Sequence, residues 1–225
     1  MIVVTGASKG LGRAICERLL SKNFEVYGLA RYVDGLSFPS QSCDVSSFEN
    51  VKGVARSIRK EGFAVSGLIN VAGIASMNLA LTTPSSVTQN ILHTNLLGTI
   101  YCCQQIAPLM VRRKSGSIIN FSTIAVALGL KGESIYAASK AGVEGFTRSF
   151  AREMADFNIN VNCIAPGPID TSLLKGITAV QIEKIVAQQI IPLQFTPDEV
   201  CDLVEIALDA RSKSLSGQVL HVGGA

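Results

Sequence analysis

Tyr136 and Lys140 are the two side chains of this sequence whose types and spacing point most directly to chemistry. They stand four residues apart, so a helix would carry both on one face. A phenol with an ordinary pKa near 10 exchanges protons poorly at neutral pH, and a nearby ammonium favours its ionised form. Lowering the phenol pKa by ~3 requires about 4 kcal/mol of differential interaction. The pair therefore predicts general acid–base chemistry in which Tyr136 exchanges a proton with a substrate oxygen.

A glycine-rich turn, Thr5-Gly6-Ala7-Ser8-Lys9-Gly10-Leu11-Gly12, follows the first apolar run of the chain. Glycines at such positions allow a tight turn, a close approach of the backbone to a pyrophosphate, and close packing of helix on strand. The helix expected from Leu11 would add free N–H groups and the positive end of its dipole. The turn indicates a dinucleotide phosphate site, and a plain glycine-rich connection is the alternative.

The elements that must position these residues alternate along the whole chain. Runs of four to six apolar residues separated by helical periodicity favour a parallel sheet covered on both faces. Strands are expected at Ile2–Thr5, Phe24–Leu29, Gln41–Cys43, Leu68–Val71, Ser117–Phe121, Ile159–Ile164 and Gln218–Val222. Helices are expected at Leu11–Leu20, Phe48–Lys60, Ser85–Met110 (mostly helical), Ser134–Asp156, Ala179–Gln189 and Pro197–Ala210.

The predicted fold class is therefore α/β: one Rossmann-type domain over residues 1–225, with a doubly wound parallel sheet of about seven strands. Ligands of such sheets bind beyond the carboxyl ends of the strands, where the glycine turn lies. One departure from the usual alternation of strands and helices is expected. Only 12 residues separate Arg31 from Asp44, and Gly35 and Pro39 within that interval oppose a helix. We expect the helix after the second strand to be shortened or missing.

Further motifs, taken in their order along the chain, resemble the short-chain dehydrogenase/reductase family. Tyr136-Ala-Ala-Ser-Lys140 matches its Tyr-x-x-x-Lys, and Asn70-Val-Ala-Gly73 matches its Asn-Asn-Ala-Gly except at Val71. Asn95 stands where the family keeps a helical Asn, and Pro166-Gly167 with Thr171 matches its Pro-Gly-x-x-x-Thr turn. The resemblance covers residues 2–224 and, within the family, is greatest to bacterial 3-oxoacyl-[acyl-carrier-protein] reductases.

This resemblance implies a ketoreductase that converts a carbonyl to a secondary alcohol. Tyr136 would donate the proton, Lys140 would also hold the nicotinamide ribose, and Asn95 would support a water-linked proton relay. The family's carbonyl-polarising hydroxyl usually lies 13 residues before the tyrosine, which is Thr123 here. A one-residue difference in the loop that follows would give that role to Ser122, so both are candidates.

The resemblance also implies a nicotinamide coenzyme, and the end of the second strand favours NADP(H). Members that prefer NAD carry an acid there, whereas this strand ends Ala30-Arg31 and Lys9 lies in the glycine turn. Two cations suit a ribose 2′-phosphate; the alternative is that Arg31 is only a solvated strand-end residue. By family analogy the cofactor-binding residues are Gly6, Ser8, Lys9, Gly10, Leu11, Gly12, Arg31, Asp44, Val45, Asn70, Ala72, Gly73, Tyr136, Lys140, Pro166, Gly167, Ile169 and Thr171.

Family analogy places a substrate lid at residues 172–192, which are rich in apolar side chains. An apolar lid suits an acyl chain, so a 3-oxoacyl thioester is the leading substrate; an ordinary amphipathic surface helix is the alternative. An acyl carrier protein could dock on Arg112-Arg113-Lys114, although a helix dipole also explains that cluster. The competing functions are a reductase or dehydrogenase of another ketone or alcohol (steroid, sugar or secondary metabolite) and an NADP-binding regulatory protein with little turnover.

Composition excludes several other classes of protein. With 48% hydrophobic and 16% charged residues in 225, the chain is neither disordered nor collagen-like. A net charge of +3 without a long basic run does not indicate a nucleic-acid-binding surface. The sequence contains no stretch of 18 apolar residues, so no membrane span is expected. Six cysteines outside any Cys-x-x-Cys spacing argue against a metal site and suit reduced thiols. We expect a cytoplasmic protein and, by family analogy, a homodimer or homotetramer.

Overall fold

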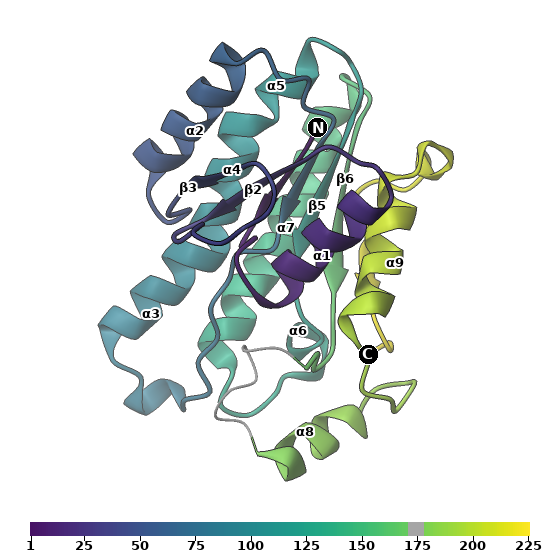
Figure 1. Cartoon of the computed structure of the whole chain (residues 1–225). Coiled ribbons are helices and arrows are strands. Elements are labelled where there is room, and N and C mark those ends of the chain that lie inside the picture. Colours follow the sequence, from purple (N-terminus) through teal and green to yellow (C-terminus); the bar gives the residue numbers. More distant parts are fainter. Residues whose placement is uncertain (171–177) are drawn as a thin grey trace.

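A parallel β-sheet forms the centre of the molecule (Figure 1). The structure, a computed structural model, describes residues 1–170 and 178–225. Within these residues the sheet has seven strands in the order β3-β2-β1-β4-β5-β6-β7, and each neighbouring pair is parallel. The strands are β1 (Ile2–Thr5), β2 (Val26–Ala30), β3 (Ser40–Ser42), β4 (Gly67–Asn70), β5 (Gly116–Phe121), β6 (Ile159–Ala165) and β7 (Val219–His221). The expected α/β fold with a doubly wound parallel sheet is confirmed.

Helices cover both faces of the sheet, so its central strands are largely buried and mostly apolar. Side chains alternate between faces along a strand, so Val3 packs in the core beneath α2 (Phe48–Lys60), α4 (Gly98–Ile106) and α7 (Ser134–Ala155). Its neighbours Ile2 and Val4 pack in the second core, beneath α1 (Gly10–Ser21) and α9 (Pro197–Leu208) (Figure 1). The remaining helical segments within residues 1–170 and 178–225 are η1 (Ala80–Thr82), α3 (Ser85–Ile91), η2 (Leu92–Leu97), α5 (Pro108–Val111), α6 (Ala125–Leu128), α8 (Ala179–Val186) and η4 (Ala210–Ser212).

The segment predicted as mostly helical over Ser85–Met110 is divided into four pieces. After α3 the chain makes one π-helical stretch, η2, and then returns to α-helix in α4. Pro108 stands at the beginning of α5, where its missing N–H is no loss. A π-helical stretch inside a helix rotates the residues that follow it, and such stretches often lie at functional sites.

The connection between β2 and β3 lacks the helix, as the sequence predicted: residues 31–39, all of which the structure describes, contain none. Phe38 takes over part of the covering role. Its ring is buried and lies so close to Gly28 that a Cβ on that glycine would stand 2.7 Å from it. The short connection is thus anchored on the sheet through Phe38, while Arg31 and Tyr32 at its beginning stay exposed.

All six cysteines are buried and free of disulfides, as the sequence suggested for core thiols. Among the described helices, none combines the length and the apolar character needed to cross a bilayer.

Candidate active site

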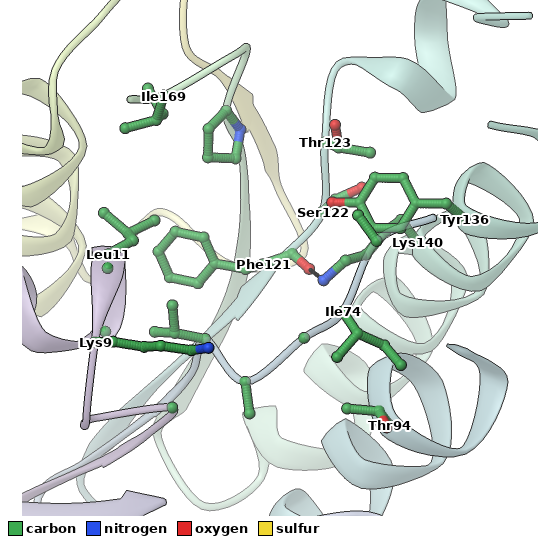
Figure 2. A pocket seen from close by; sticks show the side chains of 18 of the residues that line it. Lys9, Leu11, Ile74, Thr94, Phe121, Ser122, Thr123, Tyr136, Lys140 and Ile169 are labelled. Atoms are coloured by element: carbon green, nitrogen blue, oxygen red, sulfur yellow. Dashed lines mark hydrogen bonds between the residues drawn. The ribbon is translucent and has the colours of Figure 1, made fainter. Parts of the chain in front are cut away.

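A cavity of about 540 Å³ lies beyond the carboxyl ends of the strands. The segment that follows each of six strands contributes to its wall, which is where an open parallel sheet binds its ligands. These segments contain Gly6–Gly12 after β1, Arg31 after β2, Asp44 after β3, Val71–Ala75 after β4, Ser122–Ala125 after β5 and Pro166–Ile169 after β6. Figure 2 shows Lys9 and Leu11 on one side of this cavity and Tyr136 and Lys140 on the other.

The glycine turn is packed so tightly that side chains are excluded. Gly6 has a φ of +71°, and a Cβ on it would stand 3.0 Å from the Ala72 backbone nitrogen. A Cβ on Gly12 would stand 2.3 Å from the Gly6 carbonyl oxygen. The N-terminus of α1 therefore forms part of the cavity wall, through Lys9, Gly10 and Leu11. Such a bare, positively polarised backbone fits the pyrophosphate of a dinucleotide.

Tyr136 and Lys140 lie on the face of α7 that is turned to the cavity, and both are buried. Lys140 Nζ donates a hydrogen bond of 2.8 Å to the Phe121 carbonyl at the end of β5 (Figure 2). Burial lowers the pKa of Lys140 to about 8. Burial, and then the carboxylate of Glu133, raise the pKa of Tyr136, while the Thr123 hydroxyl acts in the opposite direction. The sequence led us to expect that Lys140 lowers the Tyr136 pKa, but the shift is upward, and desolvation of the phenol is its largest cause.

Ser122 and Thr123 are adjacent but have different partners. The Ser122 hydroxyl donates a buried hydrogen bond of 2.7 Å to the Glu144 carboxylate on α7. Both residues line the cavity, and the Thr123 hydroxyl lies near enough to the Tyr136 phenol to act on its pKa. The single hydroxyl proton of Ser122 is thus already used within the protein, whereas the Thr123 hydroxyl stands beside Tyr136.

Three consecutive residues at the end of β5 are bound to one face of α7. Asn120 donates to the Thr147 hydroxyl at 2.9 Å, Phe121 accepts from Lys140, and Ser122 donates to Glu144. The four helix residues of this face, Tyr136, Lys140, Glu144 and Thr147, follow helical spacing. Glu144 and Thr147 are not among the site residues predicted from the sequence, although continuing that spacing beyond Lys140 points to both.

Asn95 lies in η2 and is fully buried, and it is not among the residues that line the cavity. Its side chain binds both backbone groups of one residue: Oδ1 accepts from Ile74 N and Nδ2 donates to Ile74 O, each at 2.9 Å. Nδ2 also donates to the Ser139 hydroxyl on α7 at 3.1 Å. Asn95 therefore joins the loop after β4 to the helix that carries Tyr136, and its predicted place in a proton relay remains a prediction.

The predicted coenzyme residues are mostly brought together. Asn70 is the exception, since its side chain is buried behind the wall, donates to Asn120 Oδ1 at 2.9 Å, and does not line the cavity. Thr171 and the first part of the predicted lid, up to residue 177, lie outside the described residues. The residues from that prediction that do line the cavity are Gly6, Ser8, Lys9, Gly10, Leu11, Gly12, Arg31, Asp44, Val45, Ala72, Gly73, Tyr136, Lys140, Pro166, Gly167 and Ile169.

Comparisons with known proteins match the chain over nearly its whole length. A family model described as short chain dehydrogenase matches residues 1–181. Carbonyl reductase family member 4 of Danio rerio is 36% identical, with 100% of this chain and 96% of the relative covered. The 3-oxoacyl-[acyl-carrier-protein] reductase FabG of Vibrio cholerae is 32% identical, with 99% and 95% covered. Among solved structures, the aldohexose dehydrogenase of Thermoplasma acidophilum has a TM-score of 0.90 at 30% identity, covering 99% of this chain and 92% of that one.

The buried ammonium leads to a prediction for stability. Lys140→Met is expected to raise the free energy of unfolding of the coenzyme-free protein at pH 7.5, and the gain should shrink by pH 10. Burial lowers the Lys140 pKa from 10.5 to about 8, so between these values the unfolded chain binds a proton that the folded one lacks. The stability of the wild type therefore rises with pH through this group, by up to ~1.4 kcal/mol per pH unit.

Urea unfolding of the wild type and of Lys140→Met at pH 7.5 and pH 10 measures this gain in the free energy of unfolding. Lys60→Met serves as the control for the substitution itself, because it removes an ammonium group that is exposed on α2. An equal gain for Lys140→Met at both pH values would contradict the prediction.

Proposed function

The chain belongs to the short-chain dehydrogenase/reductase family, and on that premise we propose that it reduces a 3-oxoacyl thioester with NADPH. It is an oxidoreductase that acts on CH–OH and C=O groups with a nicotinamide coenzyme. One observation carries the proposal: the glycine turn and the pair Tyr136–Lys140 line the same cavity. A dinucleotide held at the turn and a carbonyl held at Tyr136 would therefore meet inside it.

The chain's own residues hold and move the proton. When bound, the coenzyme supplies the hydride that reduces the carbonyl carbon. Burial raises the pKa of Tyr136, so at neutral pH the phenol carries the proton that the carbonyl oxygen must receive. Thr123 stands beside Tyr136 and can donate a hydrogen bond to the same oxygen, which polarises the carbonyl. The Lys140 ammonium, one helical turn away, stabilises the phenolate left after the transfer.

Three features support NADP(H) over NAD(H). The strand β2 ends in Ala30 rather than an acid, and the cationic residues Lys9 and Arg31 both line the cavity. Asp44, the acidic residue of this part of the wall, accepts hydrogen bonds from the Ser46 backbone and hydroxyl, at 3.0 Å and 2.7 Å. One of its two carboxylate oxygens, Oδ1, is thus occupied by the chain itself. A 2′-phosphate beside Arg31 and Lys9 would gain charge-assisted hydrogen bonds.

An apolar substrate is supported by the part of the wall around Tyr136. Ile124, Leu130, and Ile182 and Ile185 of α8 line it, which suits the acyl chain of a 3-oxoacyl thioester. The relatives named as 3-oxoacyl-[acyl-carrier-protein] reductases point to the same class of substrate.

The basic cluster Arg112-Arg113-Lys114 is a poor docking place for an acyl carrier protein. It lies just before the first residue of β5, whereas Ser122 and Thr123 follow the last. Six strand residues separate the two ends, a distance of roughly 20 Å. Figure 1 likewise shows α5 at the opposite end of the sheet from α6 and α8. We propose that a carrier-bound acyl group enters at the α8 side instead.

The proposed function is tested by following NADPH oxidation with acetoacetyl thioesters as substrate. The wild type is expected to turn over, and Tyr136→Phe, which removes the proton donor and little else, is expected to lower kcat at least a hundredfold. Affinity for NADPH, measured by fluorescence, should change less than about threefold. A wild type that binds NADPH but reduces neither thioesters nor a wide set of free ketones would favour the regulatory alternative.

The two adjacent hydroxyls are separated by a set of substitutions. Thr123→Val keeps the shape but loses the donor, so kcat should fall about a hundredfold, while Thr123→Ser should retain most of it. Ser122→Ala leaves the buried Glu144 carboxylate without its hydroxyl donor, so it should lower the free energy of unfolding by about 2 kcal/mol with a smaller effect on kcat. An equal loss of kcat in Ser122→Ala and Thr123→Val, measured well below both melting temperatures, would reject the assignment to Thr123.

Arg31→Asp tests the choice of coenzyme. An acid at this position repels a 2′-phosphate and can accept from a 2′-hydroxyl, so the ratio of kcat/KM for NADPH to that for NADH should fall at least tenfold. Arg56→Asp on the exposed face of α2 makes the same change in charge away from the cavity, and should leave the ratio unchanged. Equal ratios in Arg31→Asp and the wild type would remove Arg31 from the phosphate site.

A further inference from the structure

Glu133 is a carboxyl group in the cavity wall that the proposed reaction does not use. It stands at the N-terminal boundary of α7, three residues before Tyr136, and its side chain caps no backbone N–H of that helix. It lines the cavity together with Leu130 and Tyr136. A carboxyl group that is partly withdrawn from water without helping to begin the helix has no evident structural task.

The surroundings of Glu133 strengthen the electrostatic effect of its charge at the end of the cavity that contains Tyr136, the reacting end. Burial raises the pKa of its carboxyl group, and its negative charge in turn raises the pKa of Tyr136. Ile124, Ile182 and Ile185 supply apolar wall at this end, where charges are screened less than in water.

The charged groups that line the cavity near Tyr136 differ from those that line it near the glycine turn. Among the described lining residues, the ionisable ones near the reacting carbonyl are Glu133, Tyr136 and Lys140, whereas Lys9, Arg31 and Asp44 belong to the segments around the glycine turn. Lys140 directs its ammonium to the Phe121 carbonyl. No described residue makes an ion pair with Glu133. A second carboxylate bound beside the reacting carbonyl would therefore meet a like charge.

We propose that Glu133 is a specificity-determining residue that excludes substrates with a negative charge next to the reacting carbonyl, so that the enzyme accepts neutral esters and thioesters of 3-oxo acids and rejects the free acids. The inference rests on the proposed ketoreductase function and adds the chemical state of the acyl group to it. Repulsion of the wrong ligand is a common source of specificity, since a like charge costs the competitor binding energy and leaves the neutral substrate unaffected.

The test compares two substrates that share one ketone, methyl acetoacetate and free acetoacetate, at saturating NADPH and pH 8. Glu133→Gln keeps the shape of the side chain and removes its charge. The ratio of kcat/KM for the ester to that for the acid should fall about tenfold in this variant, which corresponds to ~1.4 kcal/mol. The gain should come from the acid, with the ester changing less than threefold.

Glu153→Gln is the matched control, because Glu153 is exposed on the same helix and does not line the cavity; its ratio should equal that of the wild type. Glu133→Ala is a second variant that should reproduce the loss of discrimination if the glutamine variant is poorly folded. An unchanged ratio in either folded Glu133 variant would overturn the proposal.

A binding measurement separates failure of this proposal from failure of the proposed function. Quenching of the fluorescence of enzyme-bound NADPH reports binding of methyl acetoacetate and acetoacetate without turnover. A wild type that binds the ester in preference to the acid, but reduces neither, would refute the ketoreductase function and leave the role of Glu133 standing. If acetoacetate binds with equal affinity to the wild type and to Glu133→Gln, the role of Glu133 is refuted whether or not turnover occurs.

Discussion

The hydrogen bond from the buried Lys140 ammonium to the Phe121 carbonyl is the contact on which the site depends. Burial lowers the Lys140 pKa to about 8, so the fold holds this cation against the preference of its charge for water. The residues before and after Phe121 make two further bonds to α7, from Asn120 to Thr147 and from Ser122 to Glu144. Because α7 cannot slide along β5 without breaking all three, Tyr136 has one position relative to the end of the strand.

A second series of polar contacts holds the two ends of the cavity at a set separation. The Ala72 backbone N–H donates to the Thr5 hydroxyl at 3.1 Å, which ties the loop after β4 to the end of β1 and the glycine turn. Two residues later the same loop is held by Asn95, whose amide also reaches Ser139 on α7. The glycine turn and the helix that carries Tyr136 are thus connected through buried and part-buried groups, which stay paired because an unpaired polar group in the interior is costly.

The missing helix after β2 changes the coenzyme end without weakening the sheet. Phe38 covers Gly28 and Ala7 from the short connection, so the core stays closed beneath it. The same shortness leaves Arg31 and Tyr32 exposed at the rim of the cavity. The proposed selection of the coenzyme by cations and the proposed selection of the substrate by apolar side chains and by Glu133 would therefore occur at opposite ends of one cavity.

Periodicity and spacing in the sequence alone determined the order of strands and helices, the glycine turn, the shared face of Tyr136 and Lys140, and the short connection from 31 to 39, because each depends on neighbours in the chain. Tertiary structure alone decided that Ser122 binds Glu144 while Thr123 stands beside Tyr136, and that Asn70 lies behind the cavity wall. Those directions are set by partners 22 and 50 residues away. The sign of the Tyr136 pKa shift was decided there too, since desolvation sums over every element that covers the phenol, and one lysine at helical spacing does not reveal it.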